Sequence, residues 1–346
     1  MITSAASRLE EEFSMLQDVA RGRLARMLGV VFAFATAGGL AGPVSAATGG
    51  TVFAYRGACD ASAAVALDSR HFVVGNDEND VLATYRRDQS TVVASLDLAQ
   101  FLGTRKKEES DIEGAAAIGS RVYWISSHSR NSRGVLQPSR HRVFATDVRE
   151  GAAPSVAPVG TPYRDLLRDL VEAPALAGWQ LAEAAKLAAE APGGLNIEGL
   201  AATPDGRLLV GFRNPLREGR ALVVPIDNPA EVINGTRARL GTPVALDLGG
   251  RGVRSIELVG SGYYIVAGPV ADSGTFALYR WSGAATDAPV PVAVELGSLR
   301  PEALFAVPAM DELVLLSDDG GTMVDGKECK SLKMPKQSFR ALTIRP

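Results

Sequence analysis

The chain has 346 residues, of which 46% are hydrophobic and 22% charged, values typical of a folded domain rather than a disordered or fibrous protein. The formal net charge is −3, and lysines and arginines are scattered without forming a basic cluster. This composition argues against recognition of nucleic acid or of an anionic membrane surface, since both need concentrated positive charge.

Residues 1–46 have the pattern of a secretory signal peptide. Arg21, Arg23 and Arg26 precede an apolar run that starts at Met27, and small residues suited to cleavage follow Pro43. A membrane anchor is the alternative, but an apolar run of about 15 residues is short for a span of about 20. We expect export to the bacterial periplasm or the medium, with no membrane contact after cleavage.

The chain contains two cysteines, Cys59 and Cys329. In an oxidising compartment such a pair is more often bonded than free. Cys59 follows the first strand expected after the signal peptide and Cys329 precedes the last one, so a disulfide would fasten the two ends of the fold together. Two unpaired thiols are the alternative.

Five segments indicate an internal repeat. Four of them carry glutamate at the third position and lead into a short apolar strand: Asp111-Ile-Glu-Gly, Asn196-Ile-Glu-Gly, Ser255-Ile-Glu-Leu and Arg300-Pro-Glu-Ala. A degenerate copy starts at Asp60, with Ser62 in place of the glutamate. Periods of about 45 to 85 residues suit propeller blades. We therefore expect one structural position to be shared by Glu113, Glu198, Glu257 and Glu302.

Residues 51–346 are predicted to form an all-β domain, a five-bladed β-propeller. In the third copy, four strand-like runs fit one blade: 199–203, 207–212, 221–226 and 243–248. The fifth copy is one strand short, and the run at 51–55 has no blade of its own. We expect this run to complete the last blade, which closes the ring by pairing the N- and C-terminal strands. Six blades are the alternative.

A helical insertion at 162–192 is expected between blades two and three. There the hydrophobic period changes from two to about 3.6, with Leu166, Leu167 and Leu170 on one face. Pro174 separates this piece from an alanine-rich helix predicted for 179–191. The insertion would either cover one face of the propeller as a lid or pack on its rim.

Two sets of polar segments should converge at one end of the propeller axis. They are the segments that lead into the first strands and the loops between the second and third strands. The resulting funnel is expected to hold the four glutamates together with Asp60, Asp77, Asn131, Asn214 and Asp318. Carboxylates this close repel one another unless they are compensated.

A hard cation would compensate them, because calcium and magnesium prefer oxygen ligands. The metal ligands predicted on this basis are the four repeat residues, Glu113, Glu198, Glu257 and Glu302. In the alternative interpretation the glutamates cap backbone amides or pair with arginine, and no metal is involved.

Three side chains in the same loops are candidates for catalysis. His128 would act as a general base, and Arg130 and Arg213 would hold a phosphate or carboxylate. An ordinary loop histidine and surface arginines are the alternatives. The motifs of nucleophile elbows, phosphate-binding loops and zinc sites are absent from the sequence, so a nucleotide-dependent or zinc enzyme is not expected.

Long segments that begin at Val122, Leu195 and Arg251 resemble the bacterial domain-of-unknown-function 3616 family. The resemblance spans nearly the whole chain after the signal peptide and implies a propeller-like exported protein without an established activity. The Glu-Gly-Leu-Ala motif at Glu198 is also similar to that of esterase-like phytases and other calcium-associated propellers, over a few residues in each blade.

The sequence therefore favours an exported, monomeric propeller that hydrolyses a phosphate or other ester at an acidic funnel containing a divalent ion. Its expected partner is a small, anionic molecule. The alternative is a non-catalytic module that binds a ligand or a protein on the same face.

Overall fold

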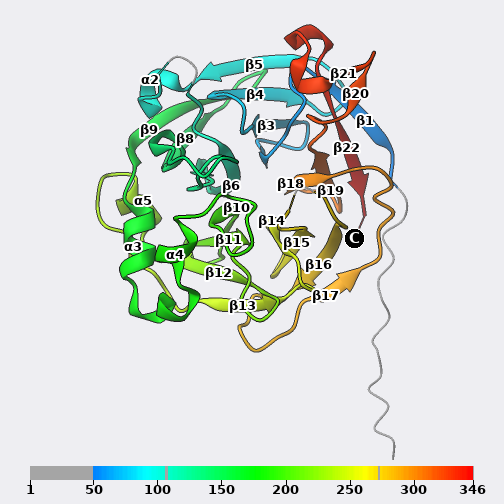
Figure 1. Cartoon of the computed structure of the whole chain (residues 1–346). Coiled ribbons are helices and arrows are strands. Elements are labelled where there is room, and N and C mark those ends of the chain that lie inside the picture. Colours follow the sequence, from blue (N-terminus) through cyan, green and yellow to red (C-terminus); the bar gives the residue numbers. More distant parts are fainter. Residues whose placement is uncertain (1–49, 106–107, 272, 346) are drawn as a thin grey trace, which may run out of the picture. The chain divides into compact units, whose positions relative to one another are not determined.

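The computed structural model describes residues 50–105, 108–271 and 273–345. These residues form five four-stranded antiparallel sheets around a common axis, a five-bladed β-propeller (Figure 1). The first strands of the five sheets contact one another in ring order, β2, β6, β10, β14 and β18, and β18 returns to β2. The fold class predicted from the repeat is confirmed.

Each blade runs outward from its first strand. The first two blades consist of β2 (Ala63–Ala66), β3 (His71–Gly75), β4 (Val81–Arg86), β5 (Val92–Asp97), and β6 (Ile112–Ile118), β7 (Arg121–Ser126), β8 (Val143–Arg149), β9 (Ser155–Tyr163). The next two consist of β10 (Asn196–Ala202), β11 (Leu208–Asn214), β12 (Arg220–Ile226), β13 (Val244–Asp247), and β14 (Gly252–Val259), β15 (Gly262–Gly268), β16 (Ala277–Trp281), β17 (Val290–Val292).

Strands from both ends of the chain close the ring. The fifth blade has the order β18 (Pro301–Ala306), β19 (Leu313–Ser317), β22 (Ser338–Ile344) and β1 (Val52–Arg56). β1 pairs antiparallel with β22, from Val52 opposite Leu342 to Arg56 opposite Ser338. The predicted terminal closure is therefore confirmed. A two-stranded hairpin, β20 (Met323–Val324) and β21 (Lys327–Glu328), lies between β19 and β22 in the chain.

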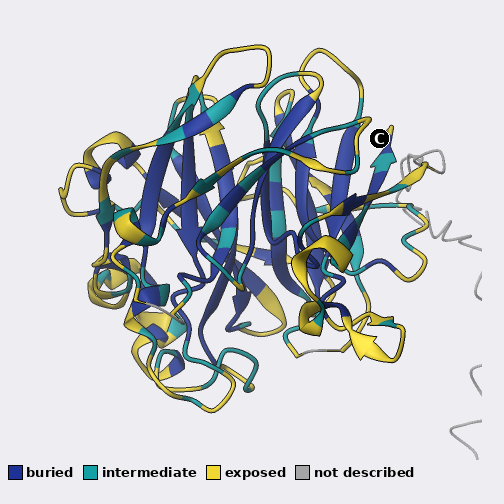
Figure 2. Cartoon of the chain, turned by 90° about the horizontal axis from the view of Figure 1, so that it is seen from above, coloured by how far each residue is buried: buried dark blue, intermediate teal, exposed yellow. Residues whose placement is uncertain are grey.

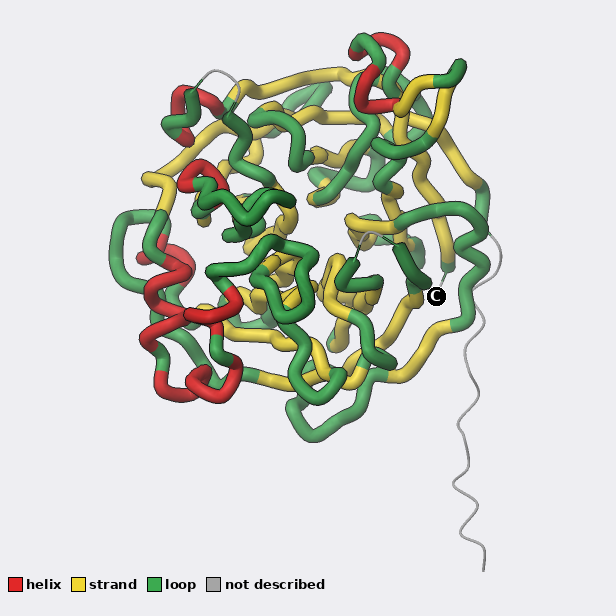
Figure 3. The backbone as a smooth tube through the Cα atoms, viewed as in Figure 1, coloured by secondary structure: helices red, strands yellow, loops and turns green. Residues whose placement is uncertain are grey.

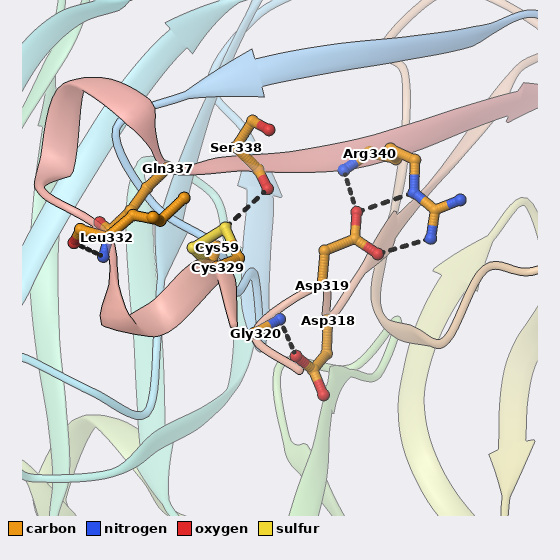
Figure 4. The surroundings of a disulfide bond; sticks show 9 residues. All are labelled: Cys59, Asp318, Asp319, Gly320, Cys329, Leu332, Gln337, Ser338 and Arg340. Carbon is orange, nitrogen blue, oxygen red and sulfur yellow. Dashed lines mark hydrogen bonds and ion pairs between the residues drawn. A yellow bond between two sulfur atoms is a disulfide. The ribbon is translucent and has the colours of Figure 1, made fainter. Parts of the chain in front are cut away.

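The predicted disulfide is also present. Cys59 and Cys329 are bonded, with 5.8 Å between their Cα atoms. Figure 4 shows that the bond lies beside the segment of Asp318 and Asp319, and the backbone N–H of Asp319 donates to the carbonyl of Cys59 at 2.9 Å. The disulfide thus ties the start of the first blade to the loop that follows β19.

Apolar side chains fill the spaces between neighbouring blades. Each of the five junctions holds a cluster of buried residues, and Figure 2 shows strands that are buried along most of their length while the connecting loops are exposed. The junction between the last and first blades is aromatic, with the rings of Phe72 and Phe305 stacked at 4.9 Å. This packing fixes the ends of the first strands around the axis.

Short helices occur in the segments that connect the strands (Figure 3). The insertion between the second and third blades contains α3 (Leu166–Glu172), η2 (Pro174–Trp179) and α4 (Leu181–Ala184). Leu166, Leu170 and Leu181 pack into the apolar cluster between those blades. The remaining short helices are α2 (Ala99–Leu102), α5 (Pro229–Val232), η1 (Pro138–Arg140), η3 (Cys329–Ser331) and η4 (Met334–Lys336).

The alanine-rich helix is much shorter than the sequence predicts. Its helical part ends at Ala184, because the segment that follows is held by hydrogen bonds from other loops. Arg130 Nε donates to the carbonyl of Ala185, and Asn214 Nδ2 donates to the carbonyls of Ala189 and Ala191. These tertiary contacts override the helix propensity of alanine.

No helix in the described part of the chain is long and apolar enough to cross a membrane. The predicted signal peptide, residues 1–46, lies outside the described residues.

Candidate functional site

A polar cavity of about 560 Å³ is formed where the loops of all five blades converge. Its described lining includes nine carboxyl groups, those of Asp60, Asp77, Glu78, Asp111, Glu113, Glu190, Glu198, Glu302 and Asp318. It also includes six cationic side chains, those of Arg130, Arg140, Arg213, Arg254, Arg300 and Lys330. Carboxyl groups thus outnumber cations in the described lining, so an acidic funnel is present where the repeat placed it.

In four of the five blades, a β-bulge turns one residue of the first strand out of register at this end of the propeller. In four blades the break in pairing falls at Glu113, Glu198, Arg254 and Glu302. All four residues line the cavity. A bulge commonly re-aims a side chain in this way, and it explains how the first strands of these four blades each direct one side chain into a shared site.

The residue of the fourth blade at this position is Arg254, and the prediction of Glu257 was wrong. Glu257 lies three residues farther along β14, opposite Tyr264, and is not part of the cavity lining. Its carboxylate accepts a hydrogen bond from the backbone N–H of Ala306 at 3.3 Å, and burial raises its pKa to about 8. Ser255-Ile-Glu resembles the other repeats in sequence, but its glutamate lies three residues after the bulge position of the fourth blade.

Arg254 joins two of the remaining glutamates. Its Nε lies 2.9 Å from Glu198 Oε2, its Nη2 contacts Glu302 Oε1, and its guanidinium lies over the ring of Phe276. Arg254 is 3% exposed, so these pairs are shielded from water. Glu198 and Glu302 are compensated by arginine, as the metal-free alternative proposed.

Arg213 completes the network around Glu198. Its Nη1 contacts Glu198 Oε1 at 3.0 Å, and its Nε donates to the carbonyl of Pro269 at 3.0 Å. Its Nη2 reaches Glu190 of the helical insertion at 3.2 Å and the carbonyl of Ala271 at 3.0 Å. All three guanidinium nitrogens form hydrogen bonds or ion pairs, so Arg213 has a fixed position in the cavity wall and connects the wall to the insertion.

Of the three glutamates at the bulges, Glu113 is the one that forms no ion pair with a described arginine. It is half-buried and forms no hydrogen bond or ion pair with another described residue. Burial, followed by the charges of Glu198, Asp111 and Asp77, raises its pKa well above the usual value. A carboxyl group of this kind takes up a proton readily and can release it, as general acids and bases require.

Arg140 forms ion pairs with two further carboxylates, those of Asp111 and Glu109. Its Nη1 lies 3.0 Å from Asp111 Oδ2, and its Nη2 lies 2.9 Å from Glu109 Oε1. Asp111 also accepts a short hydrogen bond from Ser127 Oγ. Burial is the largest cause that raises the pKa of Asp111 to about 7, although Arg140 acts in the opposite direction.

A third group of carboxyls consists of Asp60, Asp77 and Asp318, which we call the aspartate group. Asp60 is 5% exposed, and no donor among the described residues reaches Asp60 Oδ1 or Asp77 Oδ1, although both atoms are buried. The carboxyl groups of Asp318 and Glu78 lie within hydrogen-bond reach of Asp60, and a bond to either of them requires that the pair hold a proton. Burial, the hydrogen bond with Asp318 and the charge of Asp77 raise the pKa of Asp60 to about 10.

Gly320 borders the aspartate group. Its backbone N–H donates to Asp318 Oδ1 at 2.8 Å. A Cβ atom at this position would lie 2.6 Å from Asp60 Oδ1 and 3.1 Å from Asp318 Oδ1. The two carboxyl groups therefore face a small space that is available because residue 320 is glycine.

The predicted loop residues reach different places. Arg130 and Asn131 line the cavity; Arg130 is held by the carbonyls of Ala185 and Gly134, and Asn131 accepts from the backbone of its own loop. Asn214 is not part of the lining and instead fixes the end of the insertion.

His128 does not line the cavity, contrary to expectation. Its ring is 2% exposed, lies 5.5 Å from the ring of His141, and contacts the carbonyl of Ser126 through Nδ1. Burial and the neighbouring His141 lower its pKa to about 3, so it is neutral at physiological pH. The positive φ of 55° at His128 turns the chain at this point.

Sequence reasoning missed several residues of the described cavity lining, among them Arg140 and Glu190. Arg140 comes from the end of the long β7–β8 loop, of which only 127–131 was assigned to the funnel. Glu190 comes from the insertion, where an alanine-rich pattern predicted a helix. Neither residue lies in the repeat, so the sequence carried no signal for them.

The predicted four-glutamate metal site does not fit this geometry, because Glu257 lies elsewhere and Arg254 stands between Glu198 and Glu302. Among the described residues, no group of three or more His, Cys, Asp or Glu side chains is placed so that it could hold a metal ion. In the aspartate group, two buried oxygens, Asp60 Oδ1 and Asp77 Oδ1, have no donor among the described residues.

A family model described as "Protein of unknown function (DUF3616)" matches residues 60–146 and 165–311. The chain belongs to this family. The match covers all five first strands of the blades, and it leaves out residues 147–164, which contain the end of β8 and the whole of β9. A search of the curated proteins found no sequence that matches the chain.

Several solved propeller structures are similar to this chain at low identity. Glutaminyl cyclase from Myxococcus xanthus is 13% identical, with a TM-score of 0.47 over 88% of this chain and 98% of that one. The aldose sugar dehydrogenase from Streptomyces coelicolor is 13% identical, with a TM-score of 0.42 over 88% and 99%. The WD40 repeats of RRP9 are 8% identical, with a TM-score of 0.40 over 86% and 100%. At these scores none of them informs the function of this chain.

Proposed function

We propose that the axial cavity binds a small polar ligand together with a hard divalent cation, calcium or magnesium, and that the cation is held by the aspartate group. The observation that carries this proposal is the pair of buried oxygens, Asp60 Oδ1 and Asp77 Oδ1, that no donor among the described residues reaches. Buried carboxyl oxygens need a proton or a cation as partner.

The charges around the cavity support a cation rather than protons alone. Asp60, Asp77 and Glu78 all have raised pKa values, with burial as the largest cause and neighbouring carboxylates next. A divalent ion would satisfy several of these groups at once and would release the proton that Asp60 otherwise shares with Asp318. Oxygen-only ligands suit calcium or magnesium.

Calorimetric titration of the protein with calcium chloride and with magnesium chloride tests the proposal. We expect saturable binding of one ion, with release of a proton, and loss of that binding in Asp60→Asn. Glu257→Gln serves as the control, because it removes a buried carboxyl group outside the cavity. Absence of saturable heat with both ions, or equal binding by Asp60→Asn, would refute cation binding at this group.

Hydrolysis of a phosphate or other ester is a second candidate function, and Glu113 is the observation that favours it. Its carboxyl group has no hydrogen-bond partner in the described structure, and its raised pKa suits a general acid. Turnover of p-nitrophenyl phosphate and p-nitrophenyl acetate would be compared for the wild type, Glu113→Gln and the control Glu257→Gln. If Glu113→Gln retains the full turnover of the wild type, Glu113 takes no part in the reaction. If the wild type shows no turnover of either ester, hydrolysis is refuted and only the proposed binding function stands.

We further propose that the protein is exported. The disulfide between Cys59 and Cys329 supports this, since such bonds form and persist in oxidising compartments. Fractionation of the bacterium that makes the protein should place it outside the cytoplasm, and recovery in the cytosolic fraction with free thiols would contradict the proposal.

A further inference from the structure

A second pocket of about 420 Å³ lies between the first two blades, beside α2 and the starts of β8 and the insertion. Its described lining carries three arginines, Arg105, Arg142 and Arg164, together with His141, and a single carboxylate, that of Glu108. The pocket shares no lining residue with the axial cavity. It is basic, whereas the axial cavity is acidic.

Backbone carbonyls, and not carboxylates, hold the two central guanidinium groups. Arg142 is 4% exposed, and it donates from Nε to the carbonyl of Leu102 at 3.1 Å and from Nη1 to those of Pro138 and His141, both at 2.8 Å. Arg164 donates from Nη2 to the same carbonyl of Leu102 at 3.2 Å. A carbonyl orients a guanidinium without cancelling its charge.

The two groups are therefore neighbours of like charge. They share one acceptor, and neither forms a salt bridge with a described residue. Burial and the charge of Arg164 lower the pKa of Arg142 to about 10, which reflects the same proximity. Asp80 and Glu108 act on the pKa of Arg142 in the opposite direction, but neither forms a salt bridge with it. An anion bound between or beside the two guanidinium groups would relieve their mutual repulsion.

Each guanidinium retains donors for such an anion. Arg142 Nη2, and Arg164 Nε and Nη1, form no hydrogen bond with the described residues, and Ser139, also buried, adds a hydroxyl to the lining. Guanidinium groups match the oxygens of phosphate and sulfate in geometry as well as charge. Two such groups supply the charge that a dianion needs.

We propose that this pocket binds a tetrahedral oxyanion, the phosphate or sulfate group of a small molecule, through Arg142 and Arg164. Its volume lies within the range of about 300–1,000 Å³ that is usual for small-molecule sites, which leaves room for the rest of a ligand beyond the anionic group. The inference is independent of the function proposed for the axial cavity, because it uses other residues.

Calorimetric titration with inorganic phosphate, inorganic sulfate and glycerol 3-phosphate tests the proposal. Arg164→Ala removes an exposed side chain and should weaken binding about 10- to 100-fold, since each charge-assisted contact contributes strongly. Arg142→Gln should abolish binding, and its melting temperature would show whether the fold is retained. Arg149→Ala is the matched control: it removes an exposed arginine from β8 of the same blade, outside the pocket.

The expected result is one saturable site, at least as tight for glycerol 3-phosphate as for the inorganic anions, that Arg149→Ala leaves unchanged. The proposal is overturned if no anion gives saturable heat or if Arg164→Ala binds like the wild type. An equal loss in Arg149→Ala would also overturn it, because it would show that only the overall charge matters. If the inorganic anions bind but glycerol 3-phosphate does not, the part of the proposal that the anionic group belongs to a small organic molecule is rejected.

Discussion

Replacement of Arg254 by methionine should be among the most damaging single changes in the axial cavity. The guanidinium is 3% exposed and contacts both Glu198 and Glu302. Loss of one partner from a buried ion pair costs about 3–5 kcal/mol, because a charge is left buried without compensation. Glu198 keeps Arg213 and Asn196, so we expect the lower end of that range, about 3 kcal/mol.

Thermal and urea unfolding of the wild type and Arg254→Met measure this loss. A domain of about 300 residues has an unfolding entropy of about 0.6 kcal/mol/K, so this loss corresponds to a fall in melting temperature of roughly 5 °C. The double variant Arg254→Met/Glu302→Gln should recover at least about 1 kcal/mol relative to additivity, since the two side chains interact directly.

The surface pair of Arg121 and Asp147 gives a matched control. Arg121 Nε lies 2.7 Å from Asp147 Oδ1, but the two side chains are 32% and 42% exposed. Arg121→Met should therefore cost no more than about 1 kcal/mol. A loss in Arg254→Met that is as small as this, or energies for the double variant that simply add, would refute the view that Arg254 compensates buried carboxylates.

Three further outcomes follow from the same geometry. The pKa of Asp60 is about 10 in the folded state, far above its value in the unfolded chain, so its contribution to stability is complete below about pH 4 and is lost as the pH rises towards 10. Asp60→Asn should therefore raise the melting temperature more at pH 8 than at pH 4. An equal effect at both pH values would contradict this. Gly320→Ala should lower stability and calcium affinity by crowding Asp60 Oδ1, whereas Gly151→Ala, where a Cβ makes only an ordinary contact at 3.6 Å, should change neither. Cys59→Ser with Cys329→Ser should lower the free energy of unfolding by about 2–5 kcal/mol, and stability that matches the wild type in non-reducing buffer would count against the bond.

The sequence was sufficient for the architecture. Strand-like runs of five to seven residues and their turns predicted the blades closely, and the unassigned run at 51–55 predicted the pairing of β1 with β22. This succeeded because each blade buries its strands against similar neighbours, so apolar pattern and structure coincide. The alanine-rich segment failed for the opposite reason, since hydrogen bonds from Arg130 and Asn214 decide its conformation.

The site was predictable only where the repeat reached it. Glu113, Glu198 and Glu302 were placed correctly because each stands at a bulge, but the bulge that puts Arg254 at the fourth position left no mark in the sequence. The partners of a carboxylate are equally hidden, because Arg254 is remote in sequence from both glutamates it contacts. Only the structure shows that, among the described residues, Glu113, Asp60 and Asp77 form no ion pair with an arginine, whereas Asp318 lies 4.0 Å from Arg300.

The claim that the axial cavity binds a divalent cation is tested most directly by a crystal structure of the protein, from crystals grown in calcium chloride at saturating concentration. Cation binding by the axial cavity predicts density with the anomalous signal of calcium among the oxygens of Asp60, Asp77 and Asp318. Clear density for these side chains with no ion between them would contradict the account.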